Sequence, residues 1–285
     1  MWKKKKTEKY FEPFPVRWRI GQRLNNLSKW LIAALAAICV IGLIVVFLSQ
    51  HTPKNSLTDI TFVRDATHRQ IETAVRKGAD ANGRDDRGNS PLIIAAIARQ
   101  DTESFITLIQ NGAEVNARNN EGKTPLMVAA EVNPNHEVIL ALIENGADVR
   151  ARTPNGETAL MFAAWNNTNE KILETLIEKG ANANEVDSNG ETALMKAAWN
   201  NANEKVILAL VQNGADPNIT GLDGKTPLLK AAWNSTNPDV VVALIKNGAN
   251  PHKTDREGKK AIDRLLGNEH LKDSKAYWEL KQVDF

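Results

Sequence analysis

The apolar and polar positions of this chain follow two different patterns. Eighteen residues, from Leu31 to Leu48, are apolar without interruption. Beyond residue 56, short apolar runs alternate with polar segments that contain glycine, and the same order of residue types returns every 34 positions. The first pattern predicts one long apolar helix, and the second predicts an array of repeated units.

Three separate sets of positions keep the 34-residue period. Glycine followed by alanine recurs at Gly78, Gly112, Gly146, Gly180, Gly214 and Gly248. Serine or threonine, followed by proline or alanine and then leucine, recurs at Ser90, Thr124, Thr158, Thr192 and Thr226. Aspartate or asparagine recurs at Asp101, Asn135, Asn169, Asn203 and Asn237. Sets that keep one period over five units indicate a repeat protein.

Each set predicts one part of a pair of helices. The serine or threonine is a helix N-cap, and the proline or alanine is the first helical residue. The Leu-x-x-Ala-Ala that follows predicts a short helix with a face of small residues, and we expect Asn166, Asn200 and Asn234 to be its C-caps. The aspartate or asparagine caps a second, longer helix, which the glycine ends as a left-handed residue. Segments such as Asp-Ser-Asn-Gly at 187–190 predict tight turns between units.

The motif as a whole resembles the ankyrin repeat. Residues 122–130 read Gly-Lys-Thr-Pro-Leu-Met-Val-Ala-Ala, and residues 142–148 read Leu-Ile-Glu-Asn-Gly-Ala-Asp. The resemblance covers about residues 57–280 and implies an all-α solenoid of paired helices with projecting β-turns. We expect an N-terminal cap unit at 57–84, full repeats at 85–118, 119–152, 153–186, 187–220 and 221–254, and a C-terminal cap unit at 255–285.

The repeats depart from the family pattern in two respects. The period is 34 residues rather than about 33, and we place the extra residue in a lengthened turn between the paired helices, as in bacterial-looking members of the family. The histidine usual after Thr-Pro-Leu is replaced by an apolar residue, so we expect an apolar contact in its place. The replacing residues are Ile93, Met127, Met161, Met195 and Leu229.

The apolar run predicts a membrane helix. As a helix it spans roughly 27 Å, close to the thickness of a bilayer's hydrocarbon core, and Trp30 stands at its start. A cleaved signal peptide is the main alternative, but residues 47–51 offer no Ala-x-Ala-like site. We therefore expect a retained signal-anchor helix at 31–49, preceded by a basic cytoplasmic tail at 1–30 and followed by a linker at 50–56.

The distribution of charge predicts the orientation of this anchor. The whole chain has a net charge of +2, but residues 1–30 contain nine Lys/Arg and two Glu, a charge of +7, which leaves −5 for the rest. Basic flanks stay on the cytoplasmic side, so we expect a single-pass inner-membrane protein with a periplasmic, or otherwise extracytoplasmic, repeat domain. An acidic domain argues against nucleic-acid binding. The single cysteine, Cys39, lies within the run, so an intramolecular disulfide is excluded.

The resemblance implies that a protein partner binds the concave face, the surface formed by the first helices and the projecting turns. The first residue after each Ala-Ala lies on this face, and these residues are Ile97, Glu131, Trp165, Trp199 and Trp233. The tryptophans either contact a partner, as Trp often does in binding hot spots, or pack on each other to seal the stack.

Charged residues of the turns are further candidates for this surface. The position before each cap holds Lys123, Glu157, Glu191 and Lys225, and one turn position of the first units holds Arg84, Arg118 and Arg152. The arginine row is either ordinary solvated charge or a basic row suited to an acidic or carboxylate-bearing protein surface.

The sequence contains none of the familiar patterns of catalysis or cofactor binding. The five histidines occupy different units and positions, and no HExxH, GxSxG, GxGxxG or Walker motif is present. We therefore expect no enzyme activity, metal, cofactor or small-molecule substrate, and predict a membrane-tethered protein-interaction module. Two alternatives remain: a spacer subunit of an envelope complex that contacts partners through its membrane helix, and a secreted effector if the apolar run is cleaved.

Overall fold

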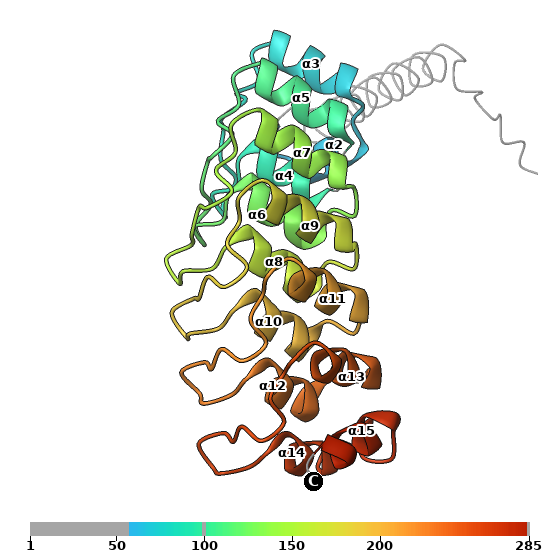
Figure 1. The fold of residues 1–285 in the computed structure, drawn as a ribbon. Helices are drawn as coiled ribbons and strands as arrows, with labels where there is room; N and C mark the ends of the chain where they lie inside the picture. Colours follow the sequence, from blue (N-terminus) through green and yellow to red (C-terminus); the bar gives the residue numbers. More distant parts are fainter. Residues whose placement is uncertain (1–56, 99–100, 284–285) are drawn as a thin grey trace, which may run out of the picture. The chain divides into compact units, whose positions relative to one another are not determined.

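The computed structural model describes residues 57–98 and 101–283, and within these ranges all regular secondary structure is helical (Figure 1). The helices alternate between two stacks. The first stack consists of α2 (Ile60–Asp65), α4 (Pro91–Ile97), α6 (Pro125–Val132), α8 (Ala159–Asn166), α10 (Ala193–Asn200), α12 (Pro227–Asn234) and α14 (Ala261–Leu266). The second consists of α3 (His68–Arg76), α5 (Thr102–Gln110), α7 (His136–Glu144), α9 (Glu170–Glu178), α11 (Glu204–Gln212), α13 (Pro238–Lys246) and α15 (Lys275–Val283). The predicted solenoid of paired helices is confirmed.

The helix ends follow the predicted caps. The Thr158 hydroxyl accepts a hydrogen bond from the backbone N–H of Met161 at the start of α8, and Asn169 caps α9 through the N–H of Lys171. These side chains satisfy N–H groups that have no partner within the helix. The repeated glycines follow the second helices with φ between 87° and 103°, a left-handed conformation that residues with a Cβ rarely adopt.

Each helix packs against its counterparts in the neighbouring units. First helices contact first helices and second helices contact second helices, as the two columns in Figure 1 show. Ala163 and Ala164 are fully buried on α8, and such small side chains let helices approach closely. The apolar residues that replace the family's histidine, such as Met127 and Leu229, are also buried. An apolar contact therefore does take the place of the histidine, as predicted.

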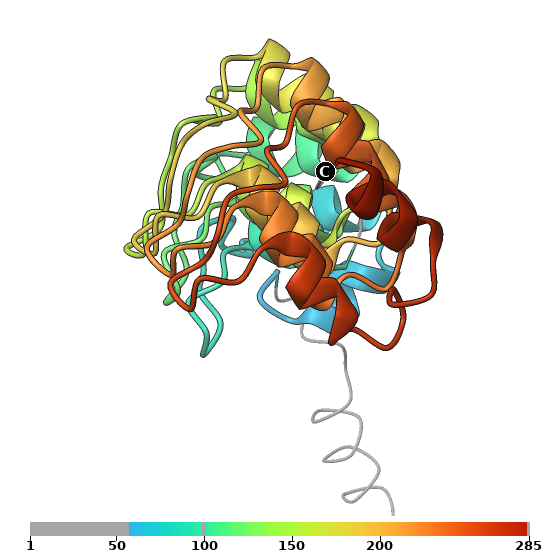
Figure 2. The ribbon, with the colours of Figure 1, turned by 60° about the horizontal axis from the view of Figure 1, so that its bottom comes forward.

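The projecting turns are closed by backbone hydrogen bonds and lie side by side in Figure 2. In the unit that begins at residue 187, the Asp187 N–H donates to the Glu191 carbonyl and the Gly190 N–H donates to the Asp187 carbonyl. Gly190 has φ +71°, and a Cβ here would lie 3.0 Å from the backbone N of Leu222 in the next turn. Glycine thus serves both the turn conformation and the close approach of successive turns.

The asparagines expected as C-caps of the first helices were wrongly assigned by one residue. Asn166 and Asn200 are the last residues of α8 and α10, and the caps are Asn167 and Asn201. The Asn200 side chain instead donates to the Trp165 carbonyl of the preceding unit at 3.0 Å. The helices run one residue further than the sequence suggested, so these asparagines connect units rather than end helices.

Another row of asparagines connects the units near the ends of the second helices. Asn116 donates to the Gly146 carbonyl at 2.9 Å and accepts from the Asp148 N–H at 2.8 Å; Asn82, Asn184 and Asn218 make the equivalent pair of bonds. Arg150 interrupts the row. Its Nε donates to the Gly180 carbonyl at 3.1 Å, but a guanidinium has no acceptor for the Asn182 N–H.

Replacing Arg150 with asparagine should therefore stabilise the protein. The new side chain can restore the missing acceptor, and one added hydrogen bond raises the free energy of unfolding by about 0.5–1.5 kcal/mol. Urea unfolding followed by circular dichroism measures this change, with Arg150→Ala as the control that supplies neither donor nor acceptor. An Arg150→Asn protein no more stable than Arg150→Ala would show that the row of asparagines contributes nothing.

The predicted membrane helix at 31–49, with the tail at 1–30 and the linker at 50–56, lies outside the described residues. Among the residues that are described, no helix is both long enough and apolar enough to cross a bilayer.

Candidate protein-binding face

Three tryptophans form a row along α8, α10 and α12, which we call the tryptophan ladder: Trp165, Trp199 and Trp233. Trp165 and Trp199 are half-buried, whereas Trp233 is 41% exposed. The rings of Trp199 and Trp233 meet edge to face with centroids 6.2 Å apart, a favoured geometry for aromatic pairs. The ladder therefore combines packing between units with an exposed aromatic surface at its carboxy-terminal end.

A cation of the next unit lies over each ring of the tryptophan ladder. Lys196 lies 6.0 Å from the Trp165 centroid, and Lys230 lies 5.5 Å from that of Trp199. The guanidinium of Arg264 is 4.4 Å from the centroid of Trp233, and the Lys225 ammonium reaches the same ring at 4.7 Å. Lys196, Lys230 and Arg264 occupy one repeat position, 34 residues apart, so cation–π contacts recur along the stack.

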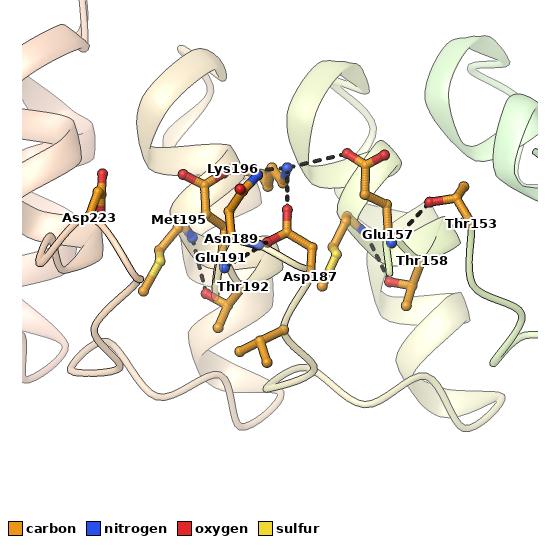
Figure 3. Close-up of polar contacts among 12 residues, drawn as sticks. Thr153, Glu157, Thr158, Asp187, Asn189, Glu191, Thr192, Met195, Lys196 and Asp223 are labelled. Atoms are coloured by element: carbon orange, nitrogen blue, oxygen red, sulfur yellow. Dashed lines mark hydrogen bonds and ion pairs between the residues drawn. The ribbon is translucent and has the colours of Figure 1, made fainter. Parts of the chain in front are cut away.

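Lys196 joins two units through three carboxylates (Figure 3). Its ammonium lies 2.7 Å from Asp187, 3.3 Å from Glu157 and 3.4 Å from Glu191. Burial lowers the pKa of Lys196, but the hydrogen bond with Asp187 and the charges of the three carboxylates outweigh burial, so the pKa lies above its ordinary value. Lys196 is therefore a charged, largely buried link between the units 153–186 and 187–220.

The same pattern of ion pairs continues toward the carboxy terminus. Lys230 lies 2.5 Å from Glu191 of the preceding unit and 3.0 Å from Asp223 of its own unit. Arg264 lies 2.5 Å from Asp255 and 2.8 Å from Glu257. Alternating charges thus accompany the tryptophan ladder from Glu157 to the C-terminal unit.

Asp255 should make stability depend on pH in the acid range. Burial raises its pKa, but hydrogen bonds from Arg264 and from the backbone of Lys259 and Glu257 outweigh burial and hold the pKa below its ordinary value. A carboxylate with a lowered folded-state pKa stabilises the protein above its unfolded-state pKa, and this stabilisation is lost as pH falls through the folded-state pKa. Asp255→Asn should therefore be less stable than the wild type at pH 6, with a difference that shrinks below about pH 4. Urea unfolding at a series of pH values measures it; a difference independent of pH would contradict this role.

The amino-terminal side of the ladder has a different arrangement. Lys123 lies 3.0 Å from Glu131 and 3.4 Å from Glu121, and its ammonium is 4.4 Å from the centroid of the Phe162 ring. Burial lowers the pKa of Lys123, but the hydrogen bonds and charges of the two carboxylates outweigh it and raise the pKa. Phe162 occupies the repeat position of Lys196, so at this unit an aromatic ring replaces the first-helix cation.

The structure brings together most of the residues predicted on the concave face. Glu131, the tryptophan ladder and the turn residues make contacts with one another or share the same ion-pair partners, and these turn residues are Lys123, Glu157, Glu191 and Lys225. Ile97 stands at the end of α4 and is 39% exposed. The predicted surface is thus charged and aromatic along its whole central part.

The arginine row of the turns makes contacts of a different kind. Arg84 donates to the Arg118 carbonyl at 2.7 Å, and Arg118 donates to the Arg152 carbonyl at 2.7 Å. Arg152 donates to the Val186 carbonyl at 2.5 Å and pairs with Glu185. Each guanidinium therefore donates to a backbone carbonyl of the next projecting turn.

Sequence reasoning missed the cations of the first helices. Lys196 and Lys230 are the charged residues of α10 and α12, and Arg264 stands at the same repeat position in α14. A charged residue recurring every 34 residues on a buried helix was the signal that could have identified them, since a buried charge requires a partner. Asp187, whose side chain is 1% exposed, is that partner for Lys196.

No group of three or more His, Cys, Asp or Glu is placed to hold a metal ion in residues 57–98 and 101–283.

Comparison with known proteins supports the repeat assignment. A family model described as ankyrin repeats (3 copies) matches residues 63–153, 133–221 and 160–255. The crystal structure of the human ASB11 ankyrin repeat domain is similar, with a TM-score of 0.68 and 22% sequence identity over 79% of this chain and 96% of that chain. At this identity the structural likeness concerns the fold. No curated protein matches the chain.

Proposed function

Because the chain belongs to the ankyrin repeat family, we propose that its repeat domain is a non-enzymatic interaction module that binds a protein partner on the concave face. The tryptophan ladder and its ion pairs are the contact surface. The observation that carries this proposal is Trp233, a large aromatic side chain that is 41% exposed beside Lys225 and Arg264. Tryptophan is enriched in binding hot spots and brings a large apolar area to an interface.

The proposal includes a membrane tether. Its support is in the sequence. Nine Lys/Arg precede the apolar run from Leu31 to Leu48, whereas the fifteen residues after Ser49 contain only two basic residues, Lys54 and Arg64. This asymmetry favours a cytoplasmic amino terminus and an extracytoplasmic repeat domain. Tethering would raise the local concentration of the bound partner at the membrane.

Photocrosslinking in cells tests the binding face. A photoreactive residue replaces Trp233 in the full chain, and a matched control replaces Lys205, an exposed residue of the second helix α11. We expect a discrete adduct from position 233 and none from position 205. Adducts from both positions, or from position 205 alone, would overturn a specific concave face. No adduct from the folded protein at position 233 would assign Trp233 to packing.

Fractionation of the same cells tests the tether. We expect the full-length chain to stay in the membrane pellet after alkaline carbonate extraction, and its repeat domain to be digested by protease added to spheroplasts. A soluble product shortened at its amino terminus would overturn the anchor in favour of the secreted alternative.

A further inference from the structure

A small pocket opens on the concave face beside Trp165. Its volume is about 150 Å³, and it is lined by Glu131, Glu157, Met161, Phe162, Trp165 and Lys196. Sites for drug-sized ligands are about two to seven times as large, about 300–1,000 Å³. A pocket of this size accommodates one side chain of a partner.

The walls of the pocket suit a side chain with an apolar stem. Met161 and Phe162 are buried residues of α8 that present thioether and aromatic surface to the pocket, and the half-buried Trp165 ring forms another wall. Over Trp165 the cation of the next unit is farther away than over the other two tryptophans, at 6.0 Å against 5.5 Å and 4.4 Å. The Lys196 ammonium also lies 2.7 Å from Asp187. Trp165 therefore has the longest cation–ring distance of the three tryptophans.

The charge around the pocket is negative. One ion-pair cluster beside it contains Lys123 with two carboxylates. The other contains three lysines with four carboxylates: Lys196, Lys225 and Lys230 with Glu157, Asp187, Glu191 and Asp223. Among the residues that line the pocket itself, two carboxylates, Glu131 and Glu157, face one cation, Lys196. Phe162 stands at the position where the next three units carry Lys196, Lys230 and Arg264. The surplus carboxylate charge is left for a cation from outside.

We propose that this pocket binds a single arginine or lysine side chain of the protein partner. The aliphatic stem packs on Met161 and Phe162, and the cationic head lies against the Trp165 ring between Glu131 and Glu157. Cation–π attraction and charge-assisted hydrogen bonds then act on the same group. This proposal rests on the proposed function and makes it more specific. It requires a basic segment in the partner, whereas the arginine row of the turns suggested an acidic partner surface.

Methionine methyl groups give a direct test. The chain contains four methionines, Met1, Met127, Met161 and Met195, so ¹³C-methyl labelling of the full chain in lipid nanodiscs yields few signals. The probe is the tripeptide acetyl-Gly-Arg-Gly-amide, and its neutral match is acetyl-Gly-citrulline-Gly-amide. We expect the arginine peptide to shift the Met161 signal in a saturable way, with little change at the buried Met127. The citrulline peptide should leave Met161 unchanged.

A matched pair of variants separates the pocket from general surface charge. Glu131→Gln removes a carboxylate that lines the pocket and should weaken binding of the arginine peptide by about three- to fivefold. Glu174→Gln changes a carboxylate on the second helix α9 and should leave binding unchanged. A Met161 signal that does not move, that moves equally with the citrulline peptide, or that responds equally to both variants would overturn the proposal.

The outcome is independent of the crosslinking experiment. If the Met161 methyl signal does not shift but position 233 gives a discrete adduct, the pocket is refuted and the proposed interaction module is not. A responsive Met161 without an adduct would support the pocket and refute the proposed partner surface at Trp233.

Discussion

Replacing Lys196 with methionine should lower the free energy of unfolding by about 3–5 kcal/mol, because it leaves a buried carboxylate without its cation. The carboxylate is that of Asp187, whose side chain is 1% exposed and lies 2.7 Å from the Lys196 ammonium. Methionine keeps most of the apolar stem, so the loss reports on charge rather than on packing. Urea unfolding followed by circular dichroism measures it.

Lys230→Met is the matched control. Lys230 occupies the same repeat position, but its partners Glu191 and Asp223 are 21% and 39% exposed. These carboxylates stay solvated when the lysine is removed, so the loss should be about 1 kcal/mol. Equal losses in the two variants would show that burial of the carboxylate does not decide the effect.

A double variant tests the same explanation from the carboxylate side. The Asp187 carboxylate accepts hydrogen bonds from the backbone N–H groups of Asn189 and Glu191. The Asn119 side-chain oxygen accepts the equivalent bonds in its own turn. Asp187→Asn therefore keeps the turn while removing the charge. In the Lys196→Met background it should restore most of the lost stability, and no recovery would contradict the role of an unpaired charge.

The second large effect is expected at Asn167. This buried side chain donates to the Ala130 and Asn133 carbonyls of the preceding unit, both at 2.9 Å, and accepts from the Asn169 N–H at 3.0 Å. The residue four positions after Ala130 is Pro134, which has no N–H to offer that carbonyl. Asn167→Ala should leave these groups unpaired and lower the free energy of unfolding by about 2–4 kcal/mol.

The neighbouring Asn166→Ala is the control for this effect. Asn166 is exposed and donates to the Glu131 carbonyl at 3.4 Å, so its replacement should lower stability by less than about 1 kcal/mol. Urea unfolding compares the two variants. If both lose the same amount, the buried bonds of Asn167 contribute no more than an exposed contact does.

Much of the fold could be predicted because its signals are local. Ser90 and Asn135 cap helices through N–H groups two or three residues away, and Gly146 adopts its left-handed conformation directly after a helix. Interactions of this range depend only on residues close together in the sequence, and the 34-residue period repeats those residues in each unit. Helix pairs, turns and the stacking of like helices followed from them.

The candidate site was predicted only in outline. The period placed Trp165, Trp199 and Trp233 on one face, because equivalent positions of a stacked repeat line up. It did not show that Lys196 lies between Asp187 and Glu157, since the latter is 39 residues away in another unit. It also did not show that Arg84 and Arg118 use their donors on neighbouring turns.

The sequence by itself determined the repeat, the helix pairs with their caps, and which residue types share a face. The tertiary structure decided the partner of each polar side chain: Asn167 bonds to the preceding unit, Arg150 donates to the Gly180 carbonyl, and Lys196 pairs with Asp187 and Glu157. The physical reason is range. Caps and turns act over two to four residues, whereas the burial and pairing of a charge depend on side chains that only the stacking of units brings within about 4 Å.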